Sequence, residues 1–218
     1  MIRGIDISDQ NDAINIAGLP ADIAFVWMKA TEGITFKDPT FQGYYQAVKD
    51  DLPNVKRGAY HFFEWQDDPT AQAQNFLSRG VDFTLPGVLP PMLDLENNSD
   101  QVDAWMLQNT AQCVQSVTTF LNYVKQQTGK DCIIYTYKNF FIEQLGGASW
   151  PNNGLWLAAY QTELPGLPPG YDESDLWFWQ YSQYGQLDGT TTGGSIDLDQ
   201  YMGTQEQLDA LTNVQETA

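Results

Sequence analysis

The chain has 218 residues and a formal net charge of −18, from 28 acidic and 10 basic residues with a single histidine. Nucleic-acid binding needs a basic face and zinc binding needs His or Cys ligands, so this composition argues against both. No apolar run approaches the ~20 residues that would span a bilayer. We expect a single domain over residues 1–218, with a core from about 2 to 213, no metal or other cofactor, and no membrane partner.

The sequence begins without a signal-peptide pattern, and its acidic charge is concentrated toward the C-terminal end. Residues 1–6 lack the basic and then apolar segments of a signal peptide, so we expect secretion by another route, or an excised or mature form. Residues 1–138 carry a net charge of −7, whereas residues 139–218 carry −11 and contain no Lys or Arg. A solvated acidic surface that favours solubility explains this excess, and we expect a monomer.

Five short apolar segments predict the first β-strands of the chain. They are rich in β-branched and aromatic residues and lack strict alternation, which is typical of strands covered on both faces of a parallel sheet. The segments are Ile2–Ile7, Phe25–Thr31, Gly58–Phe63, Pro91–Glu96 and Cys132–Tyr137.

Helical patterns lie between these strands. Asp38-Pro39 and Asp68-Pro69 each combine an N-cap residue with proline at the first helical position, and therefore predict helix starts. Apolar residues recurring at three and four predict one long helix over about Val102–Gln127, ended by Gly129. Thr204–Gln207 reads as a capping box for a last helix.

Three further strands follow without helical connections. They are expected at Leu155–Tyr160, Trp177–Ser182 and Ser195–Asp199, and the first gap contains Pro165, Pro168 and Pro169, which oppose a regular helix. Eight strands, five with helical connections and three without, predict an α/β fold: an irregular TIM-like barrel of the form (β/α)5(β)3.

Carboxylates gather at the predicted strand ends, where a β/α barrel has its active site. Asp6 ends the first strand, Asp94 and Glu96 end the fourth, and Asp197 ends the eighth. Residues two apart on a strand share a face, and two close carboxylates raise one pKa. Glu96 is therefore the candidate proton donor for a glycosidic oxygen, with the other three acids ionised. Asp199 shares a face with Asp197, so the choice between those two stays open.

Aromatic residues at strand ends are candidates for stacking against sugar rings, although core packing is the alternative for each. They are Tyr60, Phe62, Tyr135, Tyr137, Tyr160, Trp179 and Tyr181. Alternation turns His61 away from Tyr60 and Phe62, which favours a hydrogen-bonded core histidine. Cys113 and Cys132 are expected to be buried free thiols. Glu32 either binds substrate or holds Lys29 or a loop.

Eight motifs occur in a fixed order between residue 4 and about residue 203. They are Gly4–Ser8, Lys29–Gly33, Gly58–Phe62, Leu93–Glu96, Ile134–Thr136, Leu155–Tyr160, Trp179–Ser182 and Ile196–Asp199. Each motif is weak alone, but the ordered set resembles the Chalaropsis-type lysozymes, glycoside hydrolase family 25. The resemblance implies the same irregular barrel and implies hydrolysis of the β-1,4 bond between N-acetylmuramic acid and N-acetylglucosamine in peptidoglycan.

The resemblance also implies roles for residues. Glu96 would be the proton donor, Asp94 would assist the substrate's 2-acetamido group, and Asp6 and Asp197 would complete the acidic cluster. Substrate would be bound by Tyr60, Phe62, Tyr135, Tyr160, Trp179 and Gln180. Such an enzyme would be secreted or released to reach the cell wall, for instance as the catalytic domain of a phage endolysin. A non-catalytic glycan-binding protein and a chitinase-like glycosidase are the alternatives.

Overall fold

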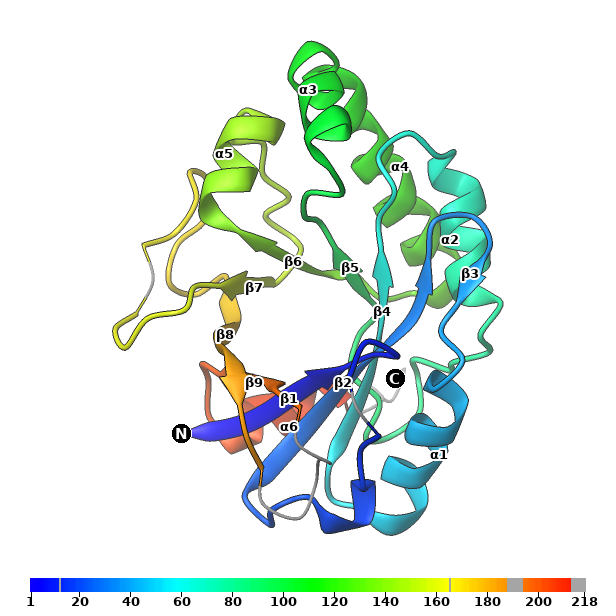
Figure 1. Ribbon diagram of the computed structural model, residues 1–218, viewed down its shortest axis with the longest axis vertical. Coiled ribbons are helices and arrows are strands. Elements are labelled where there is room, and N and C mark those ends of the chain that lie inside the picture. The colour runs from blue at the N-terminus through cyan, green and yellow to red at the C-terminus, as the bar shows by residue number, and fades with distance from the viewer. Residues whose placement is uncertain (12, 165, 188–193, 213–218) are drawn as a thin grey trace, which may run out of the picture.

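Eight strands of the chain close into a barrel (Figure 1). The computed structural model describes residues 1–11, 13–164, 166–187 and 194–212, so Pro165 and the expected core boundary at 213 lie outside the described residues. The order around the barrel is β1-β9-β8-β7-β6-β5-β4-β2, and pairing of β2 with β1 closes it. The strands are β1 (Ile2–Ile7), β2 (Ile23–Glu32), β4 (Lys56–Phe62), β5 (Met92–Asp94), β6 (Ile133–Tyr137), β7 (Leu155–Ala158), β8 (Leu176–Gly185) and β9 (Ile196–Tyr201).

One strand of the barrel runs against the others. β1, β2 and β4 to β8 are mutually parallel, whereas β9 is antiparallel to both β8 and β1. The connection from β8 to β9 is too short for a crossover, and a short connection returns the chain antiparallel. The expectation that Asp197 ends its strand is therefore wrong. Asp197 is the second residue of β9, and it reaches the barrel mouth because β9 begins there.

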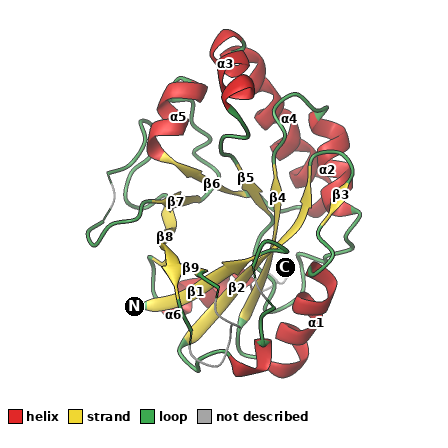
Figure 2. Ribbon diagram, viewed as in Figure 1, coloured by secondary structure: helices red, strands yellow, loops and turns green. Residues whose placement is uncertain are grey.

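All α-helices except the last lie along the upper and right sides of the barrel in the view of Figures 1 and 2, and the last helix lies at the lower left. No helix occurs between β7 and β9 in the part of the chain that the structure describes, and the connection from β1 to β2 holds only a 3-10 turn, η1 (Ile16–Gly18). The irregular barrel expected from the sequence is confirmed, but the first strand is followed by this turn instead of a helix, so four strands, not the expected five, have α-helical connections to the next strand. The helices are α1 (Phe41–Asp51), α2 (Pro69–Leu77), α3 (Asp100–Gln108), α4 (Thr110–Thr128), α5 (Lys138–Leu145) and α6 (Gln205–Thr212). Within the described ranges no helix is long and apolar enough to cross a membrane.

The predicted helix starts have different outcomes. The Asp68 carboxylate accepts a hydrogen bond from the Ala71 amide at 2.8 Å and caps α2, as expected. The start predicted at Asp38-Pro39 is too early, since α1 begins at Phe41. Asp38 instead accepts hydrogen bonds from the Thr40 and Phe41 amides, which forms a separate turn before the helix.

The prediction of one long helix over Val102–Gln127 is wrong, because the chain breaks at Asn109 into α3 and α4. Asn109 leaves helical geometry at φ −129° and ψ 25°, and its side-chain amide donates to the Trp105 carbonyl at 2.8 Å. That bond satisfies a carbonyl at the end of α3 that the helix no longer uses. Gly129 ends α4 in the left-handed conformation, as expected.

One short strand has no counterpart in the sequence prediction, and the helix after the fifth predicted strand is expected there only without bounds. The helix α5 follows directly after β6, and the short strand β3 (Phe36–Lys37) pairs antiparallel with the end of β2, outside the barrel. The capping box of the last helix is confirmed, because the Thr204 amide and the Gln207 side chain form one hydrogen bond while the Gln207 amide and the Thr204 hydroxyl form the other.

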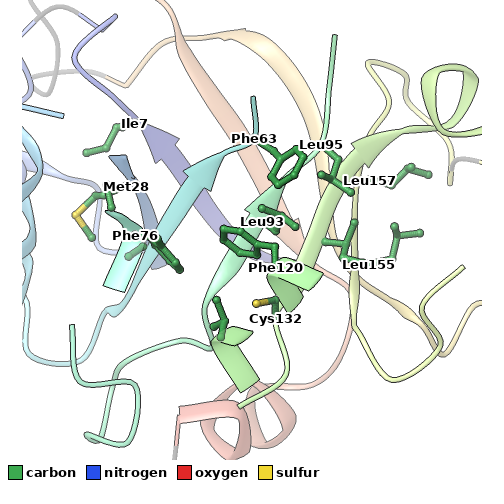
Figure 3. Close-up of a cluster of buried hydrophobic side chains, with 14 of the residues drawn as sticks. Ile7, Met28, Phe63, Phe76, Leu93, Leu95, Phe120, Cys132, Leu155 and Leu157 are labelled. Atoms are coloured by element: carbon green, nitrogen blue, oxygen red, sulfur yellow. The ribbon is translucent and has the colours of Figure 1, made fainter. Parts of the chain in front are cut away.

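The hydrophobic core has two layers. Figure 3 shows the outer layer, in which Leu93 from β5 lies beside Phe120 from α4, with Leu155 from β7 and Leu95, which follows β5, in the same cluster. The inner layer fills the barrel with aromatic rings and leaves no room for a side chain at Gly58, where a Cβ would lie 2.1 Å from the Trp27 ring.

The end of the barrel opposite the mouth is closed by α6. Its Leu208 is fully buried in the inner layer. Its Asp209 carboxylate pairs at 2.7 Å with Lys56, the first residue of β4. A site in this barrel therefore opens at the other end, where the parallel strands finish.

Candidate active site

A pocket of about 240 Å³ lies at the open mouth of the barrel. The four acids expected from the sequence, Asp6, Asp94, Glu96 and Asp197, all line it. So do four of the six expected substrate-binding residues: Tyr60, Tyr135, Tyr160 and Gln180. The remaining lining residues are Met92, Trp156 and Gln183.

Asp94 and Glu96 enter the pocket from the end of β5. Asp94 is the last residue of the strand and is only 6% exposed, and its buried Oδ1 has no hydrogen-bond partner among the described residues. Glu96 follows as a half-buried residue whose backbone carbonyl accepts a hydrogen bond from the Trp65 indole at 2.8 Å. Leu93 and Leu95 point into the outer core layer, so alternation turns the two acids to the pocket.

Burial raises the pKa of both carboxyl groups. The pKa of Glu96 rises to about 7, mainly because burial removes water, with the charge of Lys29 opposing the rise and that of Asp197 adding to it. The pKa of Asp94 is raised well above its usual range by burial and then by the charge of Glu96. The pair therefore retains a proton at a pH where an isolated carboxyl group would be ionised.

Asp6 and Asp197 come from adjacent strands on the other side of the pocket. They face each other in the antiparallel register of β1 and β9, and Asp6 accepts a hydrogen bond from the Gln180 amide at 2.7 Å. Burial and the charge of Asp197 raise the pKa of Asp6 well above its usual range. Burial raises the pKa of Asp197 to about 6.

A hydrogen-bond network fixes the orientation of the buried Gln180 side chain. Its amide nitrogen donates to Asp6, so its oxygen must accept. The hydroxyl groups of Tyr135 and Tyr160 both donate to that oxygen at 2.9 Å. Gln180 thus connects the acid on β1 to two tyrosines on other segments of the barrel mouth.

The other two expected substrate-binding residues lie outside the pocket lining. Trp179 precedes Gln180 on β8 and so points to the opposite face, where its indole donates to the Ala159 carbonyl at 2.8 Å. Phe62 lies beneath the Lys29 ammonium group, 4.7 Å from the ring centre. Phe62 is nevertheless the register partner of Asp94 on the neighbouring strand, so its backbone lies beside the acid cluster although its ring does not line the pocket.

The lining residues that the sequence prediction missed are Met92, Trp156 and Gln183. Alternation along a strand could have indicated two of them, because residues an even number apart share a face. Trp156 lies four residues before Tyr160, and Met92 lies two residues before Asp94. Alternation could not have indicated Gln183, because the pairing of β8 with β9 shifts register after Gln180.

His61 belongs to the core, as expected. It is fully buried, and its ring stacks on Phe120 at 5.1 Å. The ring bonds to the Thr31 hydroxyl at 2.8 Å and to the Gln72 side-chain oxygen at 3.1 Å. Burial lowers the pKa of His61 to about 3, so the ring is neutral and remote from the pocket chemistry.

Lys29 and Glu32 resolve a question that the sequence left open. The Lys29 ammonium group lies 2.5 Å from the Glu32 carboxylate, so Glu32 holds Lys29.

Cys113 and Cys132 are buried free thiols, as expected. Among the residues described, no group of three or more His, Cys, Asp or Glu side chains is arranged to hold a metal ion.

Comparison with known proteins gives consistent matches over nearly the whole chain. The sequence profile described as "Glycosyl hydrolases family 25" matches residues 5–190. Lysozyme M1 of Streptomyces globisporus is 32% identical over 97% of this chain and 71% of its own length. The N,O-diacetylmuramidase of Chalaropsis sp is 31% identical over 81% of this chain and 86% of its own length. The crystal structure of the bacterial lysozyme from Streptomyces coelicolor superposes with a TM-score of 0.85 at 29% identity, covering 97% of each chain.

Proposed function

The chain belongs to glycosyl hydrolases family 25, and from this premise we propose that it is a muramidase. It hydrolyses the β-1,4 bond between N-acetylmuramic acid and N-acetylglucosamine in bacterial peptidoglycan, as the names of its lysozyme and N,O-diacetylmuramidase relatives suggest. The observation that carries the proposal is the pocket in which Asp6, Asp94, Glu96 and Asp197 converge, with the pKa of Glu96 raised to about 7 by burial.

Glu96 is the proton donor to the leaving glycosidic oxygen. A general acid works best when its pKa lies near the operating pH, and Glu96 meets this condition. It is also half-buried and longer than Asp94, so it reaches further into the pocket than that nearly inaccessible carboxyl group. Protonation by Glu96 allows the glycosidic bond to break while positive charge develops on the sugar.

The other acids act on that positive charge and on the sugar that carries it. Asp94 accepts a hydrogen bond from the 2-acetamido group and orients it toward the reacting carbon. Asp6 and Asp197 lie across the pocket, and negative charge there stabilises an oxocarbenium-like or oxazolinium-like cation. Not every carboxyl group in so small a volume is ionised, so the proton on Glu96 also reduces repulsion among them.

Tyr60, Tyr135 and Tyr160 offer ring faces and hydroxyl groups to the bound glycan, while Gln180 holds two of these hydroxyls in place. Phe62 and Trp179 do not line the pocket, and any contact that they make with the glycan lies at or beyond its edge. Because the substrate is the cell wall, the enzyme acts after secretion or release.

Reducing-end analysis of digested peptidoglycan tests this function. The wild-type protein should generate new muramic-acid reducing ends, whereas Glu96→Gln should lower the rate by about 10²–10⁴, the usual contribution of a general acid. Glu143→Gln, on the exposed face of α5, is the matched control and should retain wild-type activity. Binding of peptidoglycan without new reducing ends would indicate a glycan-binding protein, and faster turnover of chitin oligomers would indicate a chitinase-like enzyme.

A further inference from the structure

Asp199 is a buried acid next to the pocket that the proposed chemistry does not use. It lies on β9 two residues after Asp197, but it is fully buried and does not line the pocket. Its Oδ1 accepts a hydrogen bond from the Trp156 indole at 3.1 Å. Its Oδ2 is also buried and has no donor among the residues that the structure describes. An ionised carboxylate with one donor and no water would be costly at this position.

The carboxyl groups of Asp6 and Asp199 lie within hydrogen-bonding reach of each other, and Gln180, the register partner of Asp199, bonds to Asp6. Two ionised carboxylates cannot form a hydrogen bond, because neither has a proton to donate. One proton shared between them would form a hydrogen bond between Asp6 and Asp199, and it would also give the unpartnered Oδ2 of Asp199 a partner. The contact therefore requires that one of the two acids is neutral.

The surroundings decide which acid holds the proton. Asp6 accepts a hydrogen bond from Gln180 at 2.7 Å and reaches the pocket, so its negative charge has a donor and some contact with solvent. Asp199 is 0% exposed, against 8% for Asp6, and its one donor is the Trp156 indole. The ionised form is thus better supported on Asp6, and the proton belongs on Asp199.

We propose that Asp199 is a positioning residue: a neutral carboxylic acid that donates a hydrogen bond to Asp6 and so keeps that carboxylate ionised and aimed into the pocket. The proposal rests on the proposed function for the role of Asp6. Burial raises the pKa of Asp199 well above its usual range, and the charges of Asp6 and Asp197 raise it further. From β7 the Trp156 indole bonds to Asp199, and on β8 Gln180 is its register partner, and neither of these side chains titrates.

The variant Asp199→Asn tests whether Asp199 acts as a neutral hydrogen-bond donor or as an ionised acid. Asp199→Asn has the same shape, is always neutral and keeps a donor for Asp6. Asp199→Leu is neutral, with the same number of heavy atoms and the same branching at Cγ, but it has no donor. Asp50→Asn, on the exposed face of α1, is the control for an acidic residue with no part in the pocket.

The pH dependence of unfolding tests the neutral state without reference to activity. Between the ordinary pKa of an Asp and the raised pKa of Asp199, the unfolded chain releases a proton that the folded chain keeps, so wild-type stability falls as the pH rises. Asp199→Asn removes this loss. From pH 4 to pH 7 the unfolding equilibrium constant of the wild type should therefore rise relative to that of Asp199→Asn, by up to about tenfold per pH unit. Asp50→Asn should show no such divergence.

Steady-state kinetics on peptidoglycan test the positioning role. Asp199→Asn should keep kcat within about threefold of the wild type. Asp199→Leu should lose about 30-fold or more in kcat with little change in KM. The acidic limb of its pH profile should also move to higher pH, because Asp6 loses a donor that stabilises its ionised form. A purely structural role would lower the amount of folded enzyme without moving that limb.

Each remaining outcome overturns a defined part of this scheme. If Asp199→Asn is as inactive as Asp199→Leu while both fold, Asp199 acts as an ionised group and the proposal is wrong. If both variants are fully active, Asp199 positions nothing. If the wild-type enzyme itself forms no reducing ends, the proposed function fails, while the unfolding measurements still decide whether Asp199 is neutral.

Discussion

The residue proposed as proton donor should also destabilise the fold at alkaline pH. We expect Glu96→Gln, which removes the titrating group at nearly constant volume, to raise the free energy of unfolding at pH 8 and leave it almost unchanged at pH 4. The pKa of Glu96 is about 7 in the folded chain against an ordinary value of 4.5. Below 4.5 the group is neutral in both states. As the pH rises to 7 the unfolded chain ionises first, so the folded state loses stability, and above 7 the loss is constant.

The magnitude follows from the size of that shift. A rise from 4.5 to about 7, at about 1.36 kcal/mol per pH unit, sets an upper limit of about 3 kcal/mol at pH 8. Neighbouring acids change their own protonation when Glu96 is neutral, so we expect about 1–3 kcal/mol. For a chain of this size each kcal/mol corresponds to about 2–4 °C, and the melting temperature should rise by about 2–12 °C.

Urea denaturation and calorimetry at pH 4 and pH 8 measure this directly, with Glu143→Gln on exposed α5 as the control. A gain of equal size at both pH values would mean that glutamine simply packs better. No gain at pH 8 would mean that Glu96 ionises in the folded enzyme as easily as in the unfolded chain. Either result would refute the burial argument on which the role of Glu96 as a general acid depends.

Three further predictions concern other parts of the molecule. Lys29→Met removes the cation that opposes the rise in the pKa of Glu96, so the alkaline limb of the pH–activity profile should move to higher pH, and Lys29→Arg should restore it. Gly58→Ala should destabilise the barrel by about 1–3 kcal/mol in urea titrations, because its Cβ would lie 2.1 Å from the Trp27 ring. The two buried thiols should react with a thiol reagent only at the rate of unfolding, since burial raises both pKa values.

The position of the acids at the barrel mouth could be predicted from the sequence because two simple rules meet there. Parallel strands finish at one end of the barrel, and alternate residues of a strand share a face. Asp6, Asp94 and Glu96 follow from these rules alone. The sequence predicts Asp197 in the correct cluster but for a wrong reason, since it treats Asp197 as the last residue of a parallel strand. Nothing in the local sequence indicates that β9 runs antiparallel.

Tertiary contacts determine the features that the sequence does not predict, namely where the long helix breaks and which strand residue faces the pocket. Apolar spacing continues through Asn109, so only the side-chain bond to the Trp105 carbonyl reveals the helix break. Trp179 and Gln180 are both predicted to bind substrate, and only Gln180 lines the pocket, because adjacent residues of one strand face opposite ways. The buried amide faces the pocket because Asp6 and two tyrosine hydroxyls satisfy it there, which a single sequence does not show.

Burial, rather than the net charge of −18, gives the pocket acids their chemistry. On the surface, hydrogen-bond donors stabilise the ionised form and lower the pKa, as Thr84 does for Asp82 and Ser174 does for Asp172. In the pocket the same type of side chain lies above the aromatic layer that fills the barrel, where water is scarce and other carboxyl groups are near. The pKa therefore shifts in the opposite direction, to about 7 for Glu96. A barrel packed with smaller side chains would admit water beneath these acids, lower their pKa values and leave no neutral carboxyl group to protonate a glycosidic oxygen.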